Sequence, residues 1–154
     1  MDKIRGFEVV KNEMRKNPEV IIELPRRNDI GSCGYDIKSP INTVIKPNEQ
    51  LLIWSDIKAY MLIDEALEAN TRSSNGTKKG VILSNIIGWI DSTYYENPDN
   101  DGNIGICLKN TGNEDFIINI GDKIAQVKFS KYLTVDNDNP INSKRIGGFG
   151  SSGK

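Results

Sequence analysis

The most distinctive chemical groups of this chain lie in its last ten residues, where one arginine and one phenylalanine stand among glycines. The sequence from Arg145 to Gly153 is RIGGFGSSG. Glycines allow backbone amides to approach a ligand closely. An aromatic ring on such a backbone, as at Phe149, suits stacking on a planar base. The same composition also fits a flexible C-terminal tail, so both interpretations stay open on these residues alone.

A second group of anion-binding side chains is Arg72-Ser73-Ser74, followed by Gly76. Arginine offers a planar fork of donors that matches phosphate oxygens. Serine hydroxyls and backbone amides next to a glycine can complete a small anion-binding nest. Strings of this type also occur in ordinary surface loops, so the pattern alone leaves both interpretations open.

A third candidate is the stretch from Asn85 to Tyr94, NIIGWIDSTY, in which an apolar run ends at an acid. A plain structural interpretation is a strand that runs into an Asp-Ser turn. The functional interpretation makes Asp91 a base for water and Tyr94 a wall of a pocket. The chain has no histidine, which excludes His-dependent triads and most catalytic zinc sites. A base must then be a carboxylate, Lys, Tyr or Cys, and a carboxylate fits water-attack chemistry beside a divalent cation.

Short strands must position these groups, because apolar and aromatic runs alternate with turn residues along most of the chain. We expect strands at 7–10, 20–24, 43–45, 51–54, 59–63, 80–83, 104–109, 116–120 and 123–132. This pattern is typical of an all-β barrel or jelly-roll-like sandwich, with at most one short helix near Ser73 to Lys79 that Gly76 weakens. Residues 95–102 and the end from 136 onward read as polar, irregular segments.

Composition narrows the class of protein further. The 154 residues suit one domain, and the net charge of -1 argues against bulk nucleic-acid binding but not against a small anionic ligand. No apolar run approaches the ~20 residues of a membrane span, and the N-terminus does not resemble a secretory signal, so we expect a cytoplasmic protein. The two cysteines, Cys33 and Cys107, belong to no CxxC pair and are expected to be reduced and partly buried.

Five segments, taken in order, resemble the five motifs of the trimeric dUTPase family. They are CGYDI at 33–37, RSS at 72–74, GWID at 88–91 with Tyr94, GDKIAQ at 121–126, and the RIGGFGSSG end. The similarity covers about residues 25–153. It implies a distorted jelly-roll-like barrel (dUTPase-like, β-clip) over 1–135 and a flexible arm over 136–154 that completes the active site. It also implies a homotrimer with shared active sites.

The resemblance further implies hydrolysis of dUTP to dUMP and pyrophosphate, with water attacking the α-phosphorus and Mg²⁺ on the triphosphate. Asp91 resembles the catalytic aspartate. Tyr94 resembles the residue under the deoxyribose, Phe149 would stack on uracil, and Asp36 would hold a metal-bound water. The residues implied in substrate binding are Arg72, Ser73, Ser74, Asn85, Trp89, Ile90, Tyr94, Gly105, Gln126, Arg145, Phe149, Gly150 and Ser151.

One departure from the family pattern is the segment 95–101 between Tyr94 and Gly102, which resembles a loop insertion. It leaves the equivalence of Gly105 open.

Two alternative functions also stay open. A dCTP deaminase or bifunctional relative shares the fold and some motifs, although the GFGSSG end and Gln126 favour dUTPase. A nucleotide-dependent regulatory protein could bind a protein partner through loop 95–102.

Overall fold

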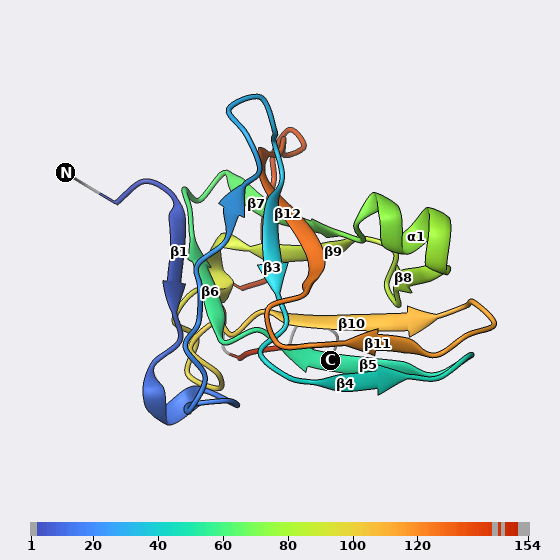
Figure 1. The fold of residues 1–154 in the computed structure, drawn as a ribbon. Coiled ribbons are helices and arrows are strands. Elements are labelled where there is room, and N and C mark those ends of the chain that lie inside the picture. Colours follow the sequence, from blue (N-terminus) through green and yellow to red (C-terminus); the bar gives the residue numbers. More distant parts are fainter. Residues whose placement is uncertain (1–2, 143–144, 146, 151–154) are drawn as a thin grey trace.

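Antiparallel strands form nearly all of the regular structure, as Figure 1 shows for the computed structural model, which describes residues 3–142, 145 and 147–150. The strands are β1 Gly6–Val9, β2 Arg26–Arg27, β3 Tyr35–Lys38, β4 Thr43–Ile45, β5 Gln50–Trp54, β6 Ile57–Tyr60, β7 Glu65–Asn70, β8 Val81–Leu83, β9 Gly88–Asp91, β10 Gly105–Asn110, β11 Phe116–Ile118 and β12 Lys123–Lys131. The helices are α1 Ser73–Lys79 and the 3-10 turns η1 Asn12–Met14 and η2 Ser92–Tyr94. The expected all-β, jelly-roll-like fold with one short α-helix is confirmed for the described residues.

The strands form four antiparallel sheets. The largest has five strands in the order β2-β3-β12-β7-β9, and a second has three in the order β5-β10-β8. The remaining two are the pairs β1-β6 and β11-β4. Neighbours in a sheet are often far apart in sequence, as when β12 lies between β3 and β7. The first, third and fourth motif segments are thereby brought into one five-stranded sheet.

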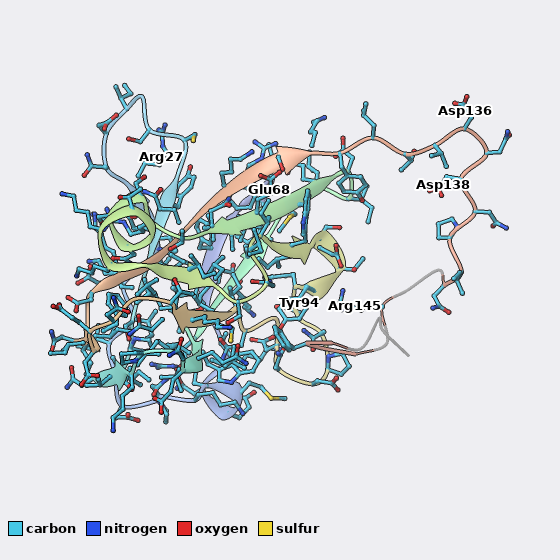
Figure 2. All side chains as sticks on the ribbon, turned by 90° about the vertical axis from the view of Figure 1, so that its right-hand side faces the viewer. Arg27, Glu68, Tyr94, Asp136, Asp138 and Arg145 are labelled. Carbon is cyan, nitrogen blue, oxygen red and sulfur yellow. The ribbon has the colours of Figure 1, made fainter. Side chains whose placement is uncertain are left out.

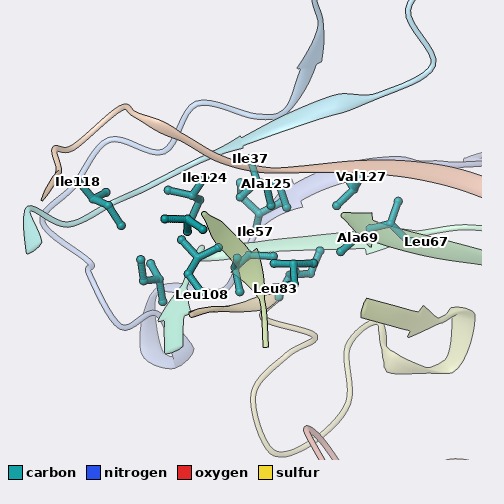
Figure 3. Packing of buried hydrophobic residues seen from close by; sticks show 14 of the residues in the cluster. Ile37, Ile57, Leu67, Ala69, Leu83, Leu108, Ile118, Ile124, Ala125 and Val127 are labelled. Carbon is teal, nitrogen blue, oxygen red and sulfur yellow. The ribbon is translucent and has the colours of Figure 1, made fainter. Parts of the chain in front are cut away.

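Aliphatic side chains from both larger sheets fill the interior (Figure 3). Ile37, Leu67, Leu83, Leu108 and Ile124 are among the buried members. Full burial of such a side chain contributes about 1.5–3 kcal/mol to the free energy of unfolding. This core fixes the sheet from whose edge strand, β9, Asp91 projects.

The expected strand at 20–24 is wrong. No strand includes these residues, and Ile21 is 92% exposed. Pro18 and Pro25 bracket the stretch, and a proline can donate no ladder hydrogen bond, so the apolar run finds no neighbouring strand.

Strand β7, with the sequence EALEAN, has no counterpart among the expected strands. Its Glu, Ala and Leu residues favour helices as isolated residues. In the structure it lies between β12 and β9, and Leu67 and Ala69 are buried. Burial between two partner strands therefore overrides the local preference.

Helix α1 begins and ends where the sequence predicts. It starts after the extended Arg72 and ends at Gly80, whose φ of 66° is left-handed. A glycine there closes the helix without a Cβ penalty. Arg72, Ser73 and Ser74 thus lie at the start of the helix, with both serines exposed.

After β12 the chain leaves the barrel. Asp136 and Asp138 lie on an extended segment away from the strands, and the chain then returns so that Arg145 lies beside Tyr94 (Figure 2). Leu133 and Ile141 on this segment are 97% and 99% exposed. Within the described ranges, no helix is long and apolar enough to cross a membrane.

Candidate active site

A pocket of about 260 Å³ lies among β8, β9, β10 and the end of the chain. Its volume is near the lower limit of about 300–1,000 Å³ for small-molecule sites. The predicted catalytic residue Asp91 lines it, together with many of the residues predicted for substrate binding, namely Asn85, Trp89, Ile90, Tyr94, Gly105, Arg145, Phe149 and Gly150. Ser151 lies outside the described residues.

Asp91 is the last residue of β9 and stands at the rim of this pocket. It is opposite Ala66 of β7, and the chain turns immediately into η2. Its side chain is 61% exposed. A carboxylate at the end of an edge strand is therefore fixed by the sheet at its backbone while its oxygens face solvent and the pocket.

Arg145 pairs with this carboxylate. Its Nη1 lies 3.0 Å from Asp91 Oδ2, and its Nε and Nη2 donate to the carbonyl oxygens of Gly147 and Gly148 at 2.7 and 3.2 Å. The guanidinium carbon also lies 5.1 Å from the centre of the Tyr94 ring. Two backbone carbonyls, one carboxylate and one ring thus hold the guanidinium in place, a geometry that a lysine could not reproduce.

Tyr94 is a buried wall of the pocket. Its hydroxyl donates to the Asn103 carbonyl oxygen at 2.8 Å and accepts a hydrogen bond from Asn100 Nδ2 at 2.7 Å. Burial raises the pKa of the Tyr94 hydroxyl, so the ring stays neutral at physiological pH. The ring is held by the two contacts of its hydroxyl and by the guanidinium that lies over its face.

Phe149 packs edge-on against Trp54, with ring centres 5.6 Å apart and planes at 75°. This geometry is a favourable one for aromatic pairs. Phe149 remains 61% exposed, so one side of its ring is free. Gly105 lies under the same indole, and a Cβ there would come within 2.9 Å of Leu52 and 3.1 Å of Trp54. Gly105 therefore keeps this side of the pocket open.

A second polar cluster joins the first, second and fourth motif segments. The buried Asp36 carboxylate lies 3.2 Å from Arg72 Nε and 2.7 Å from Lys123 Nζ, and it accepts a hydrogen bond from Gln126 Nε2 at 3.3 Å. Strand pairing places Asp36 directly opposite Gln126. Together with the exposed serines at the start of α1, the cluster presents two cations and several donors, which suits a polyphosphate.

The pocket and the polar cluster around Asp36 are separate within one chain. Among the residues that the structure describes, no hydrogen bond or ion pair links Asp36, Arg72 or Gln126 to Asp91, Tyr94 or Arg145. The structure thus brings the predicted residues together as two groups rather than one.

The donor set does not form a carboxylate cage for a metal. No group of three or more Asp, Glu, Cys or His side chains among the described residues could hold an ion. Asp36 already faces two cations. Mg²⁺ commonly keeps several waters and binds phosphate oxygens, so the residues present fit a metal that is carried by a phosphate ligand.

Several contributing residues have no motif to mark them. Trp54 supports Phe149, Asn100 and Asn103 support Tyr94, and Asp99 accepts a hydrogen bond from Gly148 N. Lys123, which contacts Asp36, lies within the GDKIAQ motif, but no role was predicted for it from the sequence. The pairing of Gln126 with Asp36 across β3 and β12 is the structural signal that brings it there. Loop 95–102 offered no such signal.

The cysteine expectation is half wrong. Both thiols are free, but Cys33 is exposed, while Cys107 is half-buried in the pocket wall near Ser84, with 3.3 Å between Sγ and Oγ. Cys33 follows the turn of residues 29–32, where solvent reaches the backbone.

Comparison with known proteins gives consistent results. The model of the dUTPase family matches residues 21–153. A deoxyuridine 5′-triphosphate nucleotidohydrolase of Lactococcus lactis subsp. lactis is 41% identical over 152 residues, 98% of this chain and 99% of the relative. One from Shewanella pealeana is 37% identical over 139 residues, 84% and 86% of the two chains.

Solved structures agree. The dUTPase from Streptococcus mutans is 35% identical and superposes with a TM-score of 0.75, covering 86% of this chain and 99% of that one. A dUTPase from phage phi11 of S. aureus, described with a structural Mg(II) ion, is 21% identical with a TM-score of 0.70 and covers 90% of this chain and 97% of its own. At that identity, the phage protein supports the fold alone.

Proposed function

Because the chain belongs to the dUTPase family and is a dUTP diphosphatase, we propose that water attacks the α-phosphorus of dUTP with Asp91 as the general base. The products are dUMP and pyrophosphate. Removal of dUTP in this way would limit the incorporation of uracil into DNA. The observation that carries the proposal is the pocket in which Asp91, Tyr94 and Phe149 meet.

Asp91 suits the role of base through its position. Its carboxylate is exposed at the pocket rim, and its partner in this structure is Arg145. A bound triphosphate competes for the guanidinium, since phosphate oxygens accept the same planar fork. Arg145 would then move to the γ-phosphate and leave the Asp91 carboxylate free to orient and deprotonate water.

The nucleoside is recognised by shape and by backbone groups. The buried ring of Tyr94 would pack against C2′ of the sugar, where a 2′-hydroxyl has no room. Asn85 and the backbone near Ile90 and Gly105 would read the uracil edge. A cytosine would leave polar groups unpaired there, at a cost of about 1–3 kcal/mol for each group. Phe149 would cover the base with its free face.

The phosphates would bind to the second cluster. Arg72, Ser73 and Ser74 would hold the α,β-bridge, Gln126 would contact phosphate oxygens, and Gly150 with Ser151 would add donors from the arm. Asp36 would orient Arg72 and Gln126 and reach a metal only through water. Magnesium bound to the triphosphate would neutralise charge that develops in the transition state.

A homotrimer with shared sites explains why the two groups are apart in one chain. A neighbouring subunit would supply the phosphate cluster to each nucleoside pocket. The exposed Leu133 and Val135 before the arm and Ile141 within it support this arrangement, because exposed apolar side chains that gather on a surface commonly mark an interface. The barrel of 1–135 and the arm of 136–154 would then be separate functional parts, and the arm could close over its own or a neighbouring pocket.

The substrate assignment is tested by incubating the protein with dUTP and dCTP in parallel. We expect pyrophosphate and dUMP from dUTP and no ammonia from dCTP. Release of ammonia from dCTP would instead support the deaminase alternative. A deaminase requires a base beside the cytosine amino group, and none of the contacts above favours that reaction over water attack at phosphorus.

The base is tested with Asp91→Asn. We expect turnover to fall about 10²–10⁴-fold, the usual contribution of a general base, while affinity for a non-hydrolysable dUTP analogue is retained. Asp115→Asn, at an exposed aspartate outside every motif and outside the pocket lining, is the matched control. Full activity of Asp91→Asn would remove Asp91 from the mechanism.

Sharing of sites is tested by mixing two inactive variants, Asp91→Asn and Arg72→Ala. If a site combines the two groups from different subunits, random mixed trimers restore about a quarter of the sites. If mixed oligomers form and no activity returns, each site is built within one chain.

A further inference from the structure

Among the described residues, the one hydrogen bond between loop 95–102 and the C-terminal arm is made by Asp99. The backbone amide of Gly148 donates to Asp99 Oδ2 at 2.6 Å. A hydrogen bond to an ionised carboxylate is about twice as strong as one between neutral groups. The contact therefore ties the arm to a loop that lies next to Tyr94 in the chain.

The turn that carries Asp99 is held by hydrogen bonds of Asn97. Asn97 is buried, and its Oδ1 accepts from the backbone amides of Asp99 and Asn100 at 3.0 and 3.2 Å. Its Nδ2 donates to the Tyr94 carbonyl oxygen at 2.8 Å. Asn100 in turn donates to the Tyr94 hydroxyl. The turn that presents Asp99 is thus fixed to the tyrosine that forms the pocket wall.

The arm lies so close to this turn at Gly148 that a side chain there would be crowded. A Cβ on Gly148 would lie 3.0 Å from both Asn97 Oδ1 and Asp99 Cβ, closer than side chains normally approach. The Gly148 carbonyl oxygen accepts from Arg145 Nη2. Gly148 therefore connects Asp99 on its amide side to Arg145 on its carbonyl side, with Phe149 as the next residue.

We propose that Asp99 is a positioning residue that seats the C-terminal arm, so that Arg145 and Phe149 are placed over the nucleotide pocket. The inference rests on the proposed function of that pocket. It gives the segment between Tyr94 and Gly102 a role within the enzyme, as the receiving surface for the arm. The same seat would serve an arm from its own or from a neighbouring subunit.

The test compares Asp99→Ala with Asp99→Asn, which keeps an acceptor oxygen, and with Asp115→Ala as an exposed control. One readout is kcat/KM for dUTP. The other needs no turnover: the rate at which trypsin cleaves after Lys144 and Arg145, followed by mass spectrometry. For Asp99→Ala we expect about a tenfold fall in kcat/KM and about tenfold faster cleavage, as for loss of a charge-assisted hydrogen bond. Asp99→Asn should recover most of both, and Asp115→Ala should match wild type.

The decisive comparison places Asp99→Ala in a chain truncated after Lys144. Without the arm, the substitution should have no further effect on kcat/KM. An equal fall in the truncated chain would mean that Asp99 acts on the pocket itself and would overturn the proposal. Wild-type kcat/KM and cleavage in full-length Asp99→Ala would overturn it as well.

Gly148→Ala keeps the proposal testable if the loop variants fold poorly, because it lies in the arm and leaves the barrel unchanged. We expect it to reproduce both effects of Asp99→Ala, and a Gly148→Ala variant with wild-type kcat/KM and cleavage would contradict the proposed contact between the arm and the loop.

If wild-type protein released no pyrophosphate from dUTP, the proposed function would fail. Unchanged trypsin cleavage in Asp99→Ala would instead contradict the positioning role of Asp99 and leave the proposed function unaffected.

Discussion

Loop 95–102 and the C-terminal arm are both polar, irregular segments, yet they are held in opposite ways. The loop is anchored by a buried ion cluster in which Lys58 Nζ lies 2.9 Å from Asp101 Oδ2 and 3.2 Å from Glu96 Oε1. The arm, over its described residues, is held by exposed or half-buried contacts of Arg145, Gly148 and Phe149. The two segments have similar compositions. They differ in how deeply the side chains that hold them are buried.

The anchor of the loop is the Asp101 carboxylate, which is buried and paired with the buried Lys58. Burial alone would lower the pKa of Lys58 and raise that of Asp101. Their mutual hydrogen bond and the other partners outweigh it, so the pKa of Lys58 is raised and that of Asp101 is lowered. The amide of Lys11 also donates to Asp101 at 2.9 Å, which joins the N-terminal segment to the loop. The arm has no comparable anchor among its described residues, which suits its proposed role as a segment that opens to release product.

The largest expected effect comes from breaking the loop's anchor with Lys58→Met. It removes the buried cation of Asp101 and leaves only the exposed Lys11 side chain, 3.5 Å away. Removal of one partner of a buried pair typically costs about 3–5 kcal/mol of the free energy of unfolding. Urea unfolding of wild type and variant measures the difference. Trypsin cleavage within the arm should change little under native conditions.

Lys109→Met is the matched control, because Lys109 lies exposed on β10. It should change the free energy of unfolding by less than about 0.5 kcal/mol. Equal stabilities of Lys58→Met and Lys109→Met would mean that the loop is no better anchored than the arm, and the comparison would fail.

A smaller effect is expected from Asn97→Ala, which affects both segments. It removes the acceptor of the Asp99 and Asn100 amides, which are only partly buried, and loss of each hydrogen bond costs about 0.5–1.5 kcal/mol. Since the same turn presents Asp99 to the arm, kcat/KM should fall together with the melting temperature. Loss of stability with unchanged kcat/KM would separate the two segments and contradict the seat.

The smallest effect is expected from Phe149→Ala, which should leave stability unchanged. Base–aromatic stacking contributes about 1–3 kcal/mol, so KM for dUTP should rise about tenfold or more. Phe149→Tyr keeps the ring and should retain nearly normal KM. An unchanged KM in Phe149→Ala would show that the ring does not contact the base.

The sequence predicted the fold class, helix α1 and most strands, because these follow from local patterns. It missed β7, whose residues favour a helix until Leu67 is buried between two strands, and it placed a strand at 20–24 where no partner exists. Similarly, the motif residues could be named from the resemblance. The separation of Asp36 from Asp91, however, follows from the order of the strands in the sheet, where β12 and β7 lie between β3 and β9. The role of Asp99 depends on a contact with Gly148, 49 residues away.

The most direct test of the arm's role in catalysis is the rate of pyrophosphate release from dUTP by the chain truncated after Lys144, with its melting temperature and oligomeric state measured in parallel. We predict a folded oligomer with the melting temperature of the full chain and a fall in kcat/KM on the order of 100-fold, as misplacement of groups around the substrate typically causes. A truncated protein with normal turnover would contradict the account, since residues 145–154 would then be a tail and not part of the active site.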